Sequence, residues 1–202
     1  MIQWRIYQTF WINFSLTNKI ELPNKKYEII LADPPWSYRQ SGGRGTAKRH
    51  YDTMSTDEIC SLPVRSISTD NAICFMWATF PNIGEALKVL SAWQFEFKTA
   101  AFVWVKKNKK SDTYFWGMGA YTRSNAEVCL LGISKKTKAK EMIKHHTVHQ
   151  IIIAPLEAHS QKPAIVRDRI IVLLGDRPRI ELFARQQVVG WDNWGLEVTK
   201  FN

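Results

Sequence analysis

Short apolar runs that alternate with a helical pattern constrain the fold of this chain more than any other feature. Residues 28–32, 72–77 and 100–105 form three such runs, each mainly apolar on both faces of an extended strand. Between the last two runs, apolar residues follow helical spacing after Pro81, which predicts a strand, a helix and a strand in that order. Strands buried on both faces are typical of parallel sheets covered by helices on both sides. We therefore expect an α/β fold with a mostly parallel sheet.

The same reasoning extends toward the carboxyl terminus. Further strands are predicted at residues 127–131, 151–154 and 179–184, and a helix at 163–174 with a proline in its first turn. The first apolar run ends at Asp33-Pro34-Pro35-Trp36, and proline does not continue a central strand. Ligands of such sheets bind beyond the carboxyl ends of the strands. This tetrapeptide therefore marks a candidate site.

The side chains of the tetrapeptide suit a planar base that bears an amino group. Two prolines fix the backbone, and the carbonyl of Pro34 remains an acceptor although proline has no N–H. Asp33 adds a carboxylate acceptor, and Trp36 offers a ring for stacking. Acceptors that hold both amino hydrogens favour the nucleophilic form of an exocyclic amine, and orienting it toward an activated methyl group supplies most of the catalysis. The alternative is a proline-stiffened turn with a core tryptophan.

Size and composition exclude several classes of protein. The 202 residues fit one domain, and 45% hydrophobic residues supply a full core, which excludes an intrinsically disordered chain. The longest uninterrupted apolar run, residues 72–78, is far shorter than a membrane-spanning helix, and the N-terminus lacks a signal-peptide pattern. Three widely spaced cysteines indicate reduced core thiols, and His145, His146 and His149 complete no recognised metal-ligand spacing. We expect no membrane association, no metal and a cytoplasmic location.

The net charge of +10 is concentrated in two segments. Residues 98–149 hold eleven Lys and Arg against three acidic residues, and residues 39–50 add four basic residues without an acid. A localised positive field suits a nucleic acid, because cations that neutralise phosphates release condensed counterions. Solvated loops are the alternative interpretation. The expected phosphate or base contacts within residues 39–50 and beside them are Tyr38, Arg39, Arg44, Lys48, Arg49 and Tyr51.

Six sequence blocks occur in order over nearly all of residues 27–197. The first block is Ala32-Asp33-Pro34-Pro35-Trp36. The others are His50-Tyr51-Asp52-Thr53-Met54, Phe75-Met76-Trp77-Ala78-Thr79 leading to Trp104-Val105-Lys106, Gly117-Met118-Gly119-Ala120-Tyr121-Thr122-Arg123, His159-Ser160-Gln161-Lys162-Pro163 and Glu181-Leu182-Phe183-Ala184-Arg185. In this order the blocks resemble the MT-A70 family of S-adenosylmethionine-dependent adenine N6-methyltransferases, whose catalytic motif is the first block.

The resemblance implies a Rossmann-like methyltransferase fold in which the catalytic loop precedes the main cofactor-binding segment. It implies a catalytic set of Asp33, Pro34, Pro35 and Trp36, with Asp33 and the Pro34 carbonyl on the adenine amino group and Trp36 on the base. The residues that it places at the cofactor, S-adenosylmethionine, are Asp33, Lys162, Phe183, Arg185 and Glu197. Tyr121 to Asn125, with Arg123, border the same face, and Glu127 falls near the base pocket.

Several of these assignments have a purely structural alternative. Phe183 is equally consistent with a core residue, Lys162 with a solvated residue at a helix start, and Glu127 with an ion-pair partner of Arg123. One residue also departs from the family pattern: Leu196 separates Gly195 from Glu197, where members commonly have Gly-Asn. Leucine cannot bind a ribose hydroxyl, so we expect other groups such as Asn193 to contribute. The first predicted strand is not directly followed by a Gly-x-Gly phosphate loop, which agrees with a cofactor that has no phosphate.

The resulting hypothesis is an adenine N6-methyltransferase of the phage or bacterial type that acts on DNA. The same reaction on RNA is the first alternative, and a non-catalytic nucleic-acid-binding partner subunit is the second. We expect residues 25–202 to form one methyltransferase domain and residues 1–24 an aromatic extension that packs on the domain or on a partner. A homodimer or heterodimer is compatible with the sequence.

Overall fold

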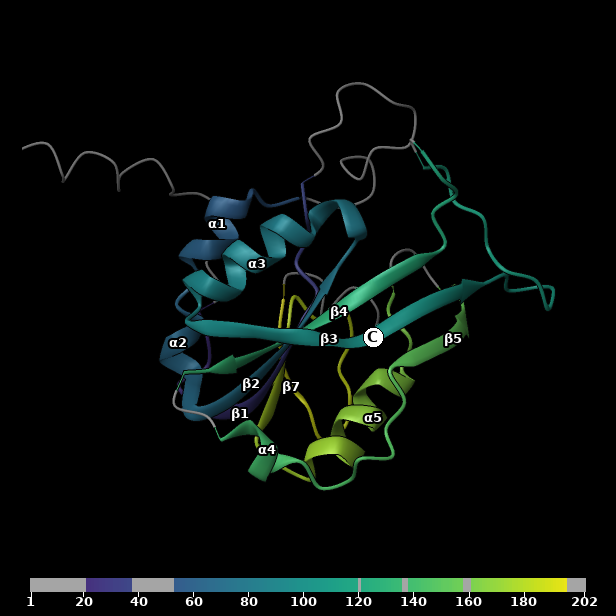
Figure 1. The fold of residues 1–202 in the computed structure, drawn as a ribbon. Coiled ribbons are helices and arrows are strands. Elements are labelled where there is room, and N and C mark those ends of the chain that lie inside the picture. Colours follow the sequence, from purple (N-terminus) through teal and green to yellow (C-terminus); the bar gives the residue numbers. More distant parts are fainter. Residues whose placement is uncertain (1–20, 38–52, 120, 136–137, 158–160, 196–202) are drawn as a thin grey trace, which may run out of the picture.

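The computed structural model describes residues 21–37, 53–119, 121–135, 138–157 and 161–195. In this part of the chain, seven strands form one sheet in the order β5-β3-β4-β2-β1-β6-β7 (Figure 1). The strands are β1 (Tyr27–Ala32), β2 (Ser68–Ala78), β3 (Phe95–Lys107), β4 (Ala126–Ser134), β5 (Ile151–Pro155), β6 (Arg179–Leu182) and β7 (Asp192–Trp194).

Most neighbouring strands of the sheet are parallel. β1 pairs in parallel with β2 and β6, β6 with β7, and β3 with β5. β4 is antiparallel to both of its neighbours, β2 and β3. All the other strands of this sheet therefore share one carboxyl edge, and β4 begins at that edge. The predicted mostly parallel sheet is confirmed, whereas the reversed direction of β4 was not predicted.

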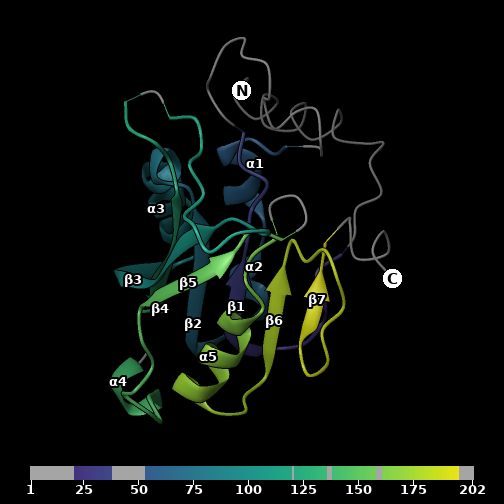
Figure 2. The same ribbon diagram turned by 90° about the vertical axis from the view of Figure 1, so that its right-hand side faces the viewer.

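Helices cover both faces of the sheet, as predicted. On one face the helices are α1 (Thr56–Ser61), α2 (Val64–Ile67) and α3 (Ile83–Ala92), which follows a short 3₁₀ turn, η2 (Phe80–Asn82). On the other face are α4 (Ala139–Met142) and α5 (Ile165–Leu174) (Figures 1 and 2). Alternate residues of β1 serve the two cores: Ile30 packs with the α3 side, and Ile29 packs with the α5 side. This period of two explains why β1 is apolar throughout.

Local sequence signals set several helix boundaries. α1 begins with a capping box, in which the Ser55 side chain accepts from the Glu58 N–H and the Glu58 carboxylate accepts from the Ser55 N–H. Such a cap contributes about 1 kcal/mol. α5 ends at Gly175, which has a φ of 82°. Glycine adopts this left-handed conformation without the steric cost that a Cβ brings.

The predicted elements are present with shifted ends, and several short elements were missed. β3 extends toward the amino side of the predicted run, and the final predicted strand ends at Leu182. α1, α2, α4 and β7 were not predicted, because three to six residues are too few to establish a period. Residues 1–20 of the predicted extension lie outside the described residues, and Leu22 packs against the core. Among the described residues, no helix has the length and apolar character needed to cross a membrane.

Candidate active site

The Asp33-Pro34-Pro35-Trp36 segment forms a tight turn directly beyond β1. The Asp33 N–H donates to the carbonyl of Leu182 at the end of β6, at 3.4 Å. The Trp36 N–H donates to the Pro34 carbonyl at 2.8 Å, which closes a three-residue γ-turn. The Pro35 carbonyl accepts from the backbone N–H of the residue that precedes the α1 cap, Met54, at 2.9 Å. The proline rings and these three hydrogen bonds fix the backbone position from which the Asp33 side chain projects.

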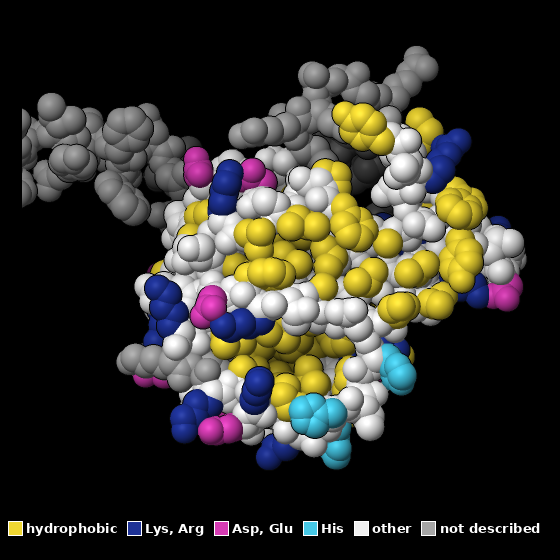
Figure 3. All heavy atoms as spheres, in the orientation of Figure 1, with side chains coloured by type: hydrophobic (Ala, Val, Ile, Leu, Met, Phe, Trp, Pro, Cys, Tyr) yellow, Lys and Arg dark blue, Asp and Glu magenta, His cyan; other side chains and the backbone are white. Residues whose placement is uncertain are grey.

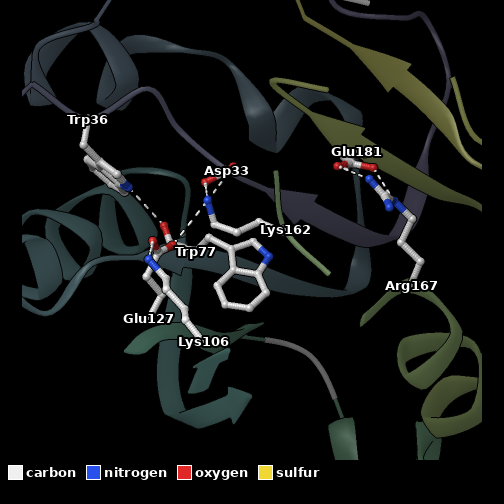
Figure 4. Close-up of polar contacts among 8 residues, drawn as sticks. All are labelled: Asp33, Trp36, Trp77, Lys106, Glu127, Lys162, Arg167 and Glu181. Atoms are coloured by element: carbon white, nitrogen blue, oxygen red, sulfur yellow. Dashed lines mark hydrogen bonds and ion pairs between the residues drawn. The ribbon is translucent and has the colours of Figure 1, made fainter. Parts of the chain in front are cut away.

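Trp36 lies in the core, which corrects the prediction of an open stacking ring. Its side chain is only 6% exposed and belongs to the cluster that packs under α3. The indole N–H donates to the carbonyl of Trp77 at 3.0 Å (Figure 4). Burying a large apolar ring is strongly favourable once its single donor has a partner. The plainer interpretation of Trp36, a core tryptophan behind a stiff turn, describes this structure.

Four charged side chains of alternating sign line the carboxyl edge beside the turn (Figure 4). The Lys162 Nζ lies 2.8 Å from both carboxylate oxygens of Asp33 and 3.3 Å from the Glu127 Oε2. The Lys106 Nζ lies 2.6 Å from the Glu127 Oε1. The side chains of all four are between 11% and 18% exposed. Two ammonium groups and two carboxylates balance, so the series is neutral as a whole.

The sheet topology brings these four residues together. Asp33 follows β1, and Lys162 precedes α5. Lys106 is near the end of β3, and Glu127 is near the start of β4, which is antiparallel to it. The backbone pairing of Trp104 with Glu127 places Lys106 diagonally across from that carboxylate, within reach of a long side chain. The reversed direction of β4 therefore puts Glu127 at the same edge as Asp33.

Opposite charges keep Lys162 and Glu127 ionised despite burial. Burial lowers the pKa of Lys162, but Asp33 and Glu127 raise it more, and the pKa of Lys162 lies above its ordinary value. Burial raises the pKa of Glu127, but Lys162 and Lys106 lower it more, and the pKa of Glu127 lies below its ordinary value. Lys162 is consequently a fixed cation near neutral pH and does not accept a proton there.

Two tryptophan rings support the ammonium groups of this series. The Lys162 Nζ lies 5.7 Å from the centre of the Trp77 ring, and the Lys106 Nζ lies 5.1 Å from the centre of the Trp104 ring. The two rings meet edge to face at 6.5 Å. A cation over an aromatic face gains about 0.5–2 kcal/mol. The rings also limit water access from below, which strengthens the ion pairs.

Two predicted cofactor residues, Phe183 and Arg185, follow β6 beside the Asp33 turn, and a third, Asn193, lies in β7. Phe183 directly follows β6 with a φ of 60°, a conformation that is rare for a bulky side chain and marks local strain. Its half-buried ring packs edge to face on Trp194 at 5.5 Å, so part of it serves the core. Arg185 is half-buried two residues further on, and Asn193 pairs with the middle of β6. Glu197 lies outside the described residues.

A second buried ion pair lies farther from the turn, between α5 and β6. The Arg167 guanidinium donates to both oxygens of the Glu181 carboxylate, at 2.7 Å and 2.9 Å (Figure 4). The two side chains are 10% and 12% exposed. Parallel bonds of this kind fix the relative orientation of both groups. This pair holds α5 on the sheet just after the segment that carries Lys162.

Three interpretations of charged residues need correction. Glu127 pairs with Lys106 and Lys162, whereas Arg123 is exposed, so the alternative of an Arg123–Glu127 pair is wrong. Lys106 belongs to the basic segment 98–149, but its side chain points inward to Glu127 because the strand register brings it there. Lys162 is not a solvated helix-start residue, since its side chain is 11% exposed. The expected phosphate or base contacts Tyr38, Arg39, Arg44, Lys48, Arg49 and Tyr51 lie outside the described residues.

Sequence reasoning missed the roles of Lys106, Trp77 and Arg167. Lys106 and Trp77 both occur in the third of the ordered blocks. Their presence in that block was the sequence signal that could have indicated their roles. Arg167 had no signal, because its partner Glu181 is distant in the sequence and is brought near by the fold. Among the described residues, no group of three or more His, Cys, Asp or Glu side chains could hold a metal ion.

Comparisons with known proteins identify the family and several relatives of this chain. The family model described as MT-A70 matches residues 27–197. The chain is 36% identical over 199 residues to the type II methyltransferase M.MunI of Mycoplasma sp, covering 88% of this chain and 80% of that protein. It is 26% identical to the human N(6)-adenine-specific methyltransferase METTL4, covering 88% of this chain and 38% of that protein. For the human N(6)-adenosine-methyltransferase catalytic subunit METTL3, the identity is 25%, with 84% and 27% covered.

Proposed function

The chain belongs to the MT-A70 family of adenine N6-methyltransferases, and from this premise we propose that it transfers a methyl group from S-adenosylmethionine to the N6 amino group of adenine in DNA. The observation that carries the proposal is the Asp33 carboxylate, which stands on a rigid turn at the carboxyl edge and is neutralised by Lys162. A partly buried carboxylate in that position is suited to accept hydrogen bonds from an amino group.

Asp33 can exchange partners without leaving a charge isolated. An adenine amino group that enters the site donates to the Asp33 carboxylate and weakens its contact with Lys162. Lys162 keeps Glu127 as a second partner, because both carboxylates lie within 3.3 Å of its Nζ. The Pro34 carbonyl already accepts from the Trp36 N–H, but a carbonyl oxygen has two lone pairs, and the second remains for the other amino hydrogen.

The residues at the strand ends fit the chemical groups of the proposed cofactor. When bound, S-adenosylmethionine supplies an activated methyl group on a cationic sulfur. The Asp33 and Glu127 carboxylates suit its positive groups, Arg185 suits its carboxylate or ribose, and the Phe183 ring suits its adenine. After methyl transfer the amino nitrogen carries an extra proton, and the Asp33 carboxylate oxygens are placed to accept its hydrogen bond and guide the proton to solvent.

DNA stands ahead of RNA in this proposal because of the pattern of similarity. Identity to the relative named a type II methyltransferase is 36%, whereas identity to the relatives whose names specify adenosine is 25% to 27%. The chain spans four fifths of the first relative but about a quarter to two fifths of the others. A duplex substrate, whether DNA or RNA, must hold the target base out of the helical stack, whereas a single strand presents it directly.

The direct test is methyl transfer from labelled S-adenosylmethionine to matched single-stranded and double-stranded DNA and RNA. Nucleoside analysis of the product should give the N6-methyl deoxyadenosine form in preference to the RNA form. A higher rate on RNA would reverse the preference. If no substrate is methylated while oligonucleotides still bind and the cofactor does not, the non-catalytic partner subunit is the correct function.

The basic segment after the turn has its own test within this proposal. We expect neutralisation of Arg44, Lys48 and Arg49 to weaken nucleic-acid binding and to reduce its dependence on salt, because each phosphate contact contributes counterion release. Binding would be measured by fluorescence anisotropy at several salt concentrations. A slope equal to that of the parent protein would remove this segment from the phosphate contacts.

A further inference from the structure

The connection between β3 and β4 forms a narrow ribbon that rises beyond the carboxyl edge of the sheet (Figure 2). We call residues 108–119 and 121–125 the β3–β4 ribbon. At its base the Lys106 N–H donates to the Asn125 carbonyl, and the Phe115 N–H donates to the Lys106 carbonyl, both at 2.9 Å. Further out, Gly117 and Ser124 exchange two backbone hydrogen bonds of 2.8 Å and 3.3 Å. The ribbon is therefore a paired structure.

Glycine allows the two sides of the ribbon to approach closely. A Cβ on Gly117 would lie 2.4 Å from the Ser124 carbonyl oxygen, and a Cβ on Gly119 would lie 1.9 Å from the Thr122 carbonyl oxygen. Contacts that short do not occur between real side chains and backbone, so the sequence is adapted to this pairing. The ribbon consequently presents its side chains in a defined way.

Large side chains on this ribbon face solvent. Trp116 is 60% exposed, Met118 is 92% exposed and Tyr121 is fully exposed. Single exposed apolar residues are common on protein surfaces, but three within six residues of one paired ribbon form a patch that suits a partner. Hydrophobic groups stand beside Lys and Arg groups in this outer region of the molecule (Figure 3).

The charge of the ribbon favours a nucleic acid as that partner. The ribbon contains Lys109, Lys110 and Arg123, and its single acid, Asp112, pairs with Lys107 at the end of β3. Cations that neutralise phosphates and flat side chains that stack on bases are the two features of nucleic-acid contact surfaces. An apolar face of another protein would account for the exposed rings but not for the excess of basic groups.

The ribbon also borders the proposed adenine pocket. Ser124 is three residues before Glu127, a distance of at most about 10 Å along the chain. Phe115 contacts the backbone of Lys106, whose side chain pairs with Glu127. When one adenine leaves the stack of a duplex and enters the pocket, a vacancy remains between the two neighbouring base pairs. The ribbon lies on the side of the pocket where this vacancy would be. Proteins that create such a vacancy often fill it with apolar side chains.

We propose that the β3–β4 ribbon enters the duplex beside the target adenine, with Met118 and Tyr121 against the bases that flank the vacancy and Trp116 at its entrance. This inference rests on the proposed function, since it identifies the substrate as a duplex whose adenine is held out of the stack. The ribbon compensates for the stacking that the displaced base loses.

The first experiment compares methylation of a DNA duplex with methylation of the same target strand alone. The variant is W116A/M118A/Y121A, and the control is F97A, an exposed aromatic in the amino half of β3. The ribbon variant should lose about tenfold or more on the duplex, given what base stacking contributes, and much less on the single strand. The control should match the parent protein on both. Equal losses of the ribbon variant on both substrates would overturn the proposal.

The second experiment tests the role of the ribbon by a binding measurement that requires no methyl transfer. Fluorescence anisotropy would compare binding of an intact duplex with binding of a duplex that has one abasic site. The parent protein should prefer the abasic duplex by about tenfold, because the vacancy is already present, and the ribbon variant should lose this preference. No preference in the parent protein would overturn the proposal. A preference without methylation of any substrate would contradict the proposed function and leave the ribbon inference standing.

The same variant distinguishes a protein partner from a nucleic acid. Light scattering would give the mass of the parent protein and of the ribbon variant. If the variant changes from a dimer to a monomer while its binding of the abasic duplex is unchanged, the ribbon is a contact between protein chains and the proposal is wrong. An unchanged mass with a lost preference for the abasic duplex supports it.

Discussion

The two buried ion-pair systems of this protein differ in geometry and in what they permit. The Arg167–Glu181 pair has two parallel hydrogen bonds between a planar guanidinium and one carboxylate. The series at the carboxyl edge instead has two ammonium groups that each contact a carboxylate as a point charge. An arginine fork loses both bonds when its partner moves, whereas lysine can shift between two acceptors. The first arrangement suits structural support and the second suits exchange with a substrate.

Both systems are nearly equal in burial, so burial alone does not separate them. Their side chains are 10% to 12% exposed in the pair and 11% to 18% exposed in the series. Position is the difference, because the series lies at the ends of strands and the pair lies between a helix and the middle of a strand. The comparison predicts that removing Asp33, the member of the series that faces the substrate, affects turnover, whereas changes in the pair affect folding.

The largest effect is expected for Asp33→Ala. Removing the acceptor for the adenine amino group should lower kcat by about 10²–10³ or more, the range found when one group that stabilises a transition state is removed. Unfolding should remain cooperative, since Asp33 is only one member of the series. Labelled methyl transfer measures kcat, and Asp57→Ala, an exposed carboxylate in α1, is the control. Unchanged turnover would contradict the catalytic assignment.

Arg167→Met should act on stability instead. It leaves the Glu181 carboxylate buried without its partner, which typically costs about 3–5 kcal/mol of the free energy of unfolding. Urea unfolding followed by tryptophan fluorescence measures this, and kcat per folded molecule should stay close to the parent value. The double variant R167M/E181L should regain much of the loss, because an apolar pair of similar size replaces both charges. A fall in kcat without a loss of stability would place this pair in the active site.

Glu127→Gln should give a smaller loss of stability that depends on pH. Because the pKa of Glu127 is lowered by folding, its stabilising contribution is present above the ordinary value of 4.5 and is lost as the pH falls through the lower folded value. The difference in unfolding free energy between the parent and the variant should be about 1–3 kcal/mol near neutral pH and should shrink in acid. Urea unfolding at several pH values measures it. A difference that grows in acid would contradict the assigned direction.

Trp36→Phe should have the smallest effect. The substitution keeps most of the buried apolar surface and removes the hydrogen bond from the indole N–H to the Trp77 carbonyl. We expect a loss of about 1 kcal/mol, or roughly 2–4 °C in Tm for a chain of this size. Calorimetry measures the Tm. A large loss of kcat with an unchanged Tm would restore the role of the Trp36 ring as a base contact.

Several parts of the fold follow from the sequence because they depend on local patterns. The apolar runs of β1, β2 and β3 and the helical spacing of α3 repeat often enough to be recognised. The direction of β4 does not follow, because an apolar strand has the same side-chain pattern whichever way it runs. The proline turn that carries Asp33 was predicted for the same local reason, since proline both ends a strand and limits the backbone.

The partners of the charged residues could not be obtained in this way. Lys106 and Glu127 meet because of strand register, and Lys162 meets Asp33 across 129 residues of sequence. The resemblance to a family located Lys162, but neither motif nor spacing predicts which carboxylates surround it. For Trp36, the chemistry of the side chain permits stacking on a base. Only the three-dimensional packing shows that the ring is buried.

The reversed direction of β4 also separates the parts of this protein that can change from those that cannot. The β3–β4 ribbon leaves and re-enters the sheet on adjacent strands, and the backbone bond from Lys106 to Asn125 closes its base. Residues beyond that bond can be lengthened, shortened or replaced without moving Asp33 or Lys162, because exposed loop ends tolerate insertion while the buried edge does not. In the proposed function, the Asp33 site stays fixed beside a ribbon that can be exchanged, so we expect new substrate preferences to arise by exchanging the ribbon alone.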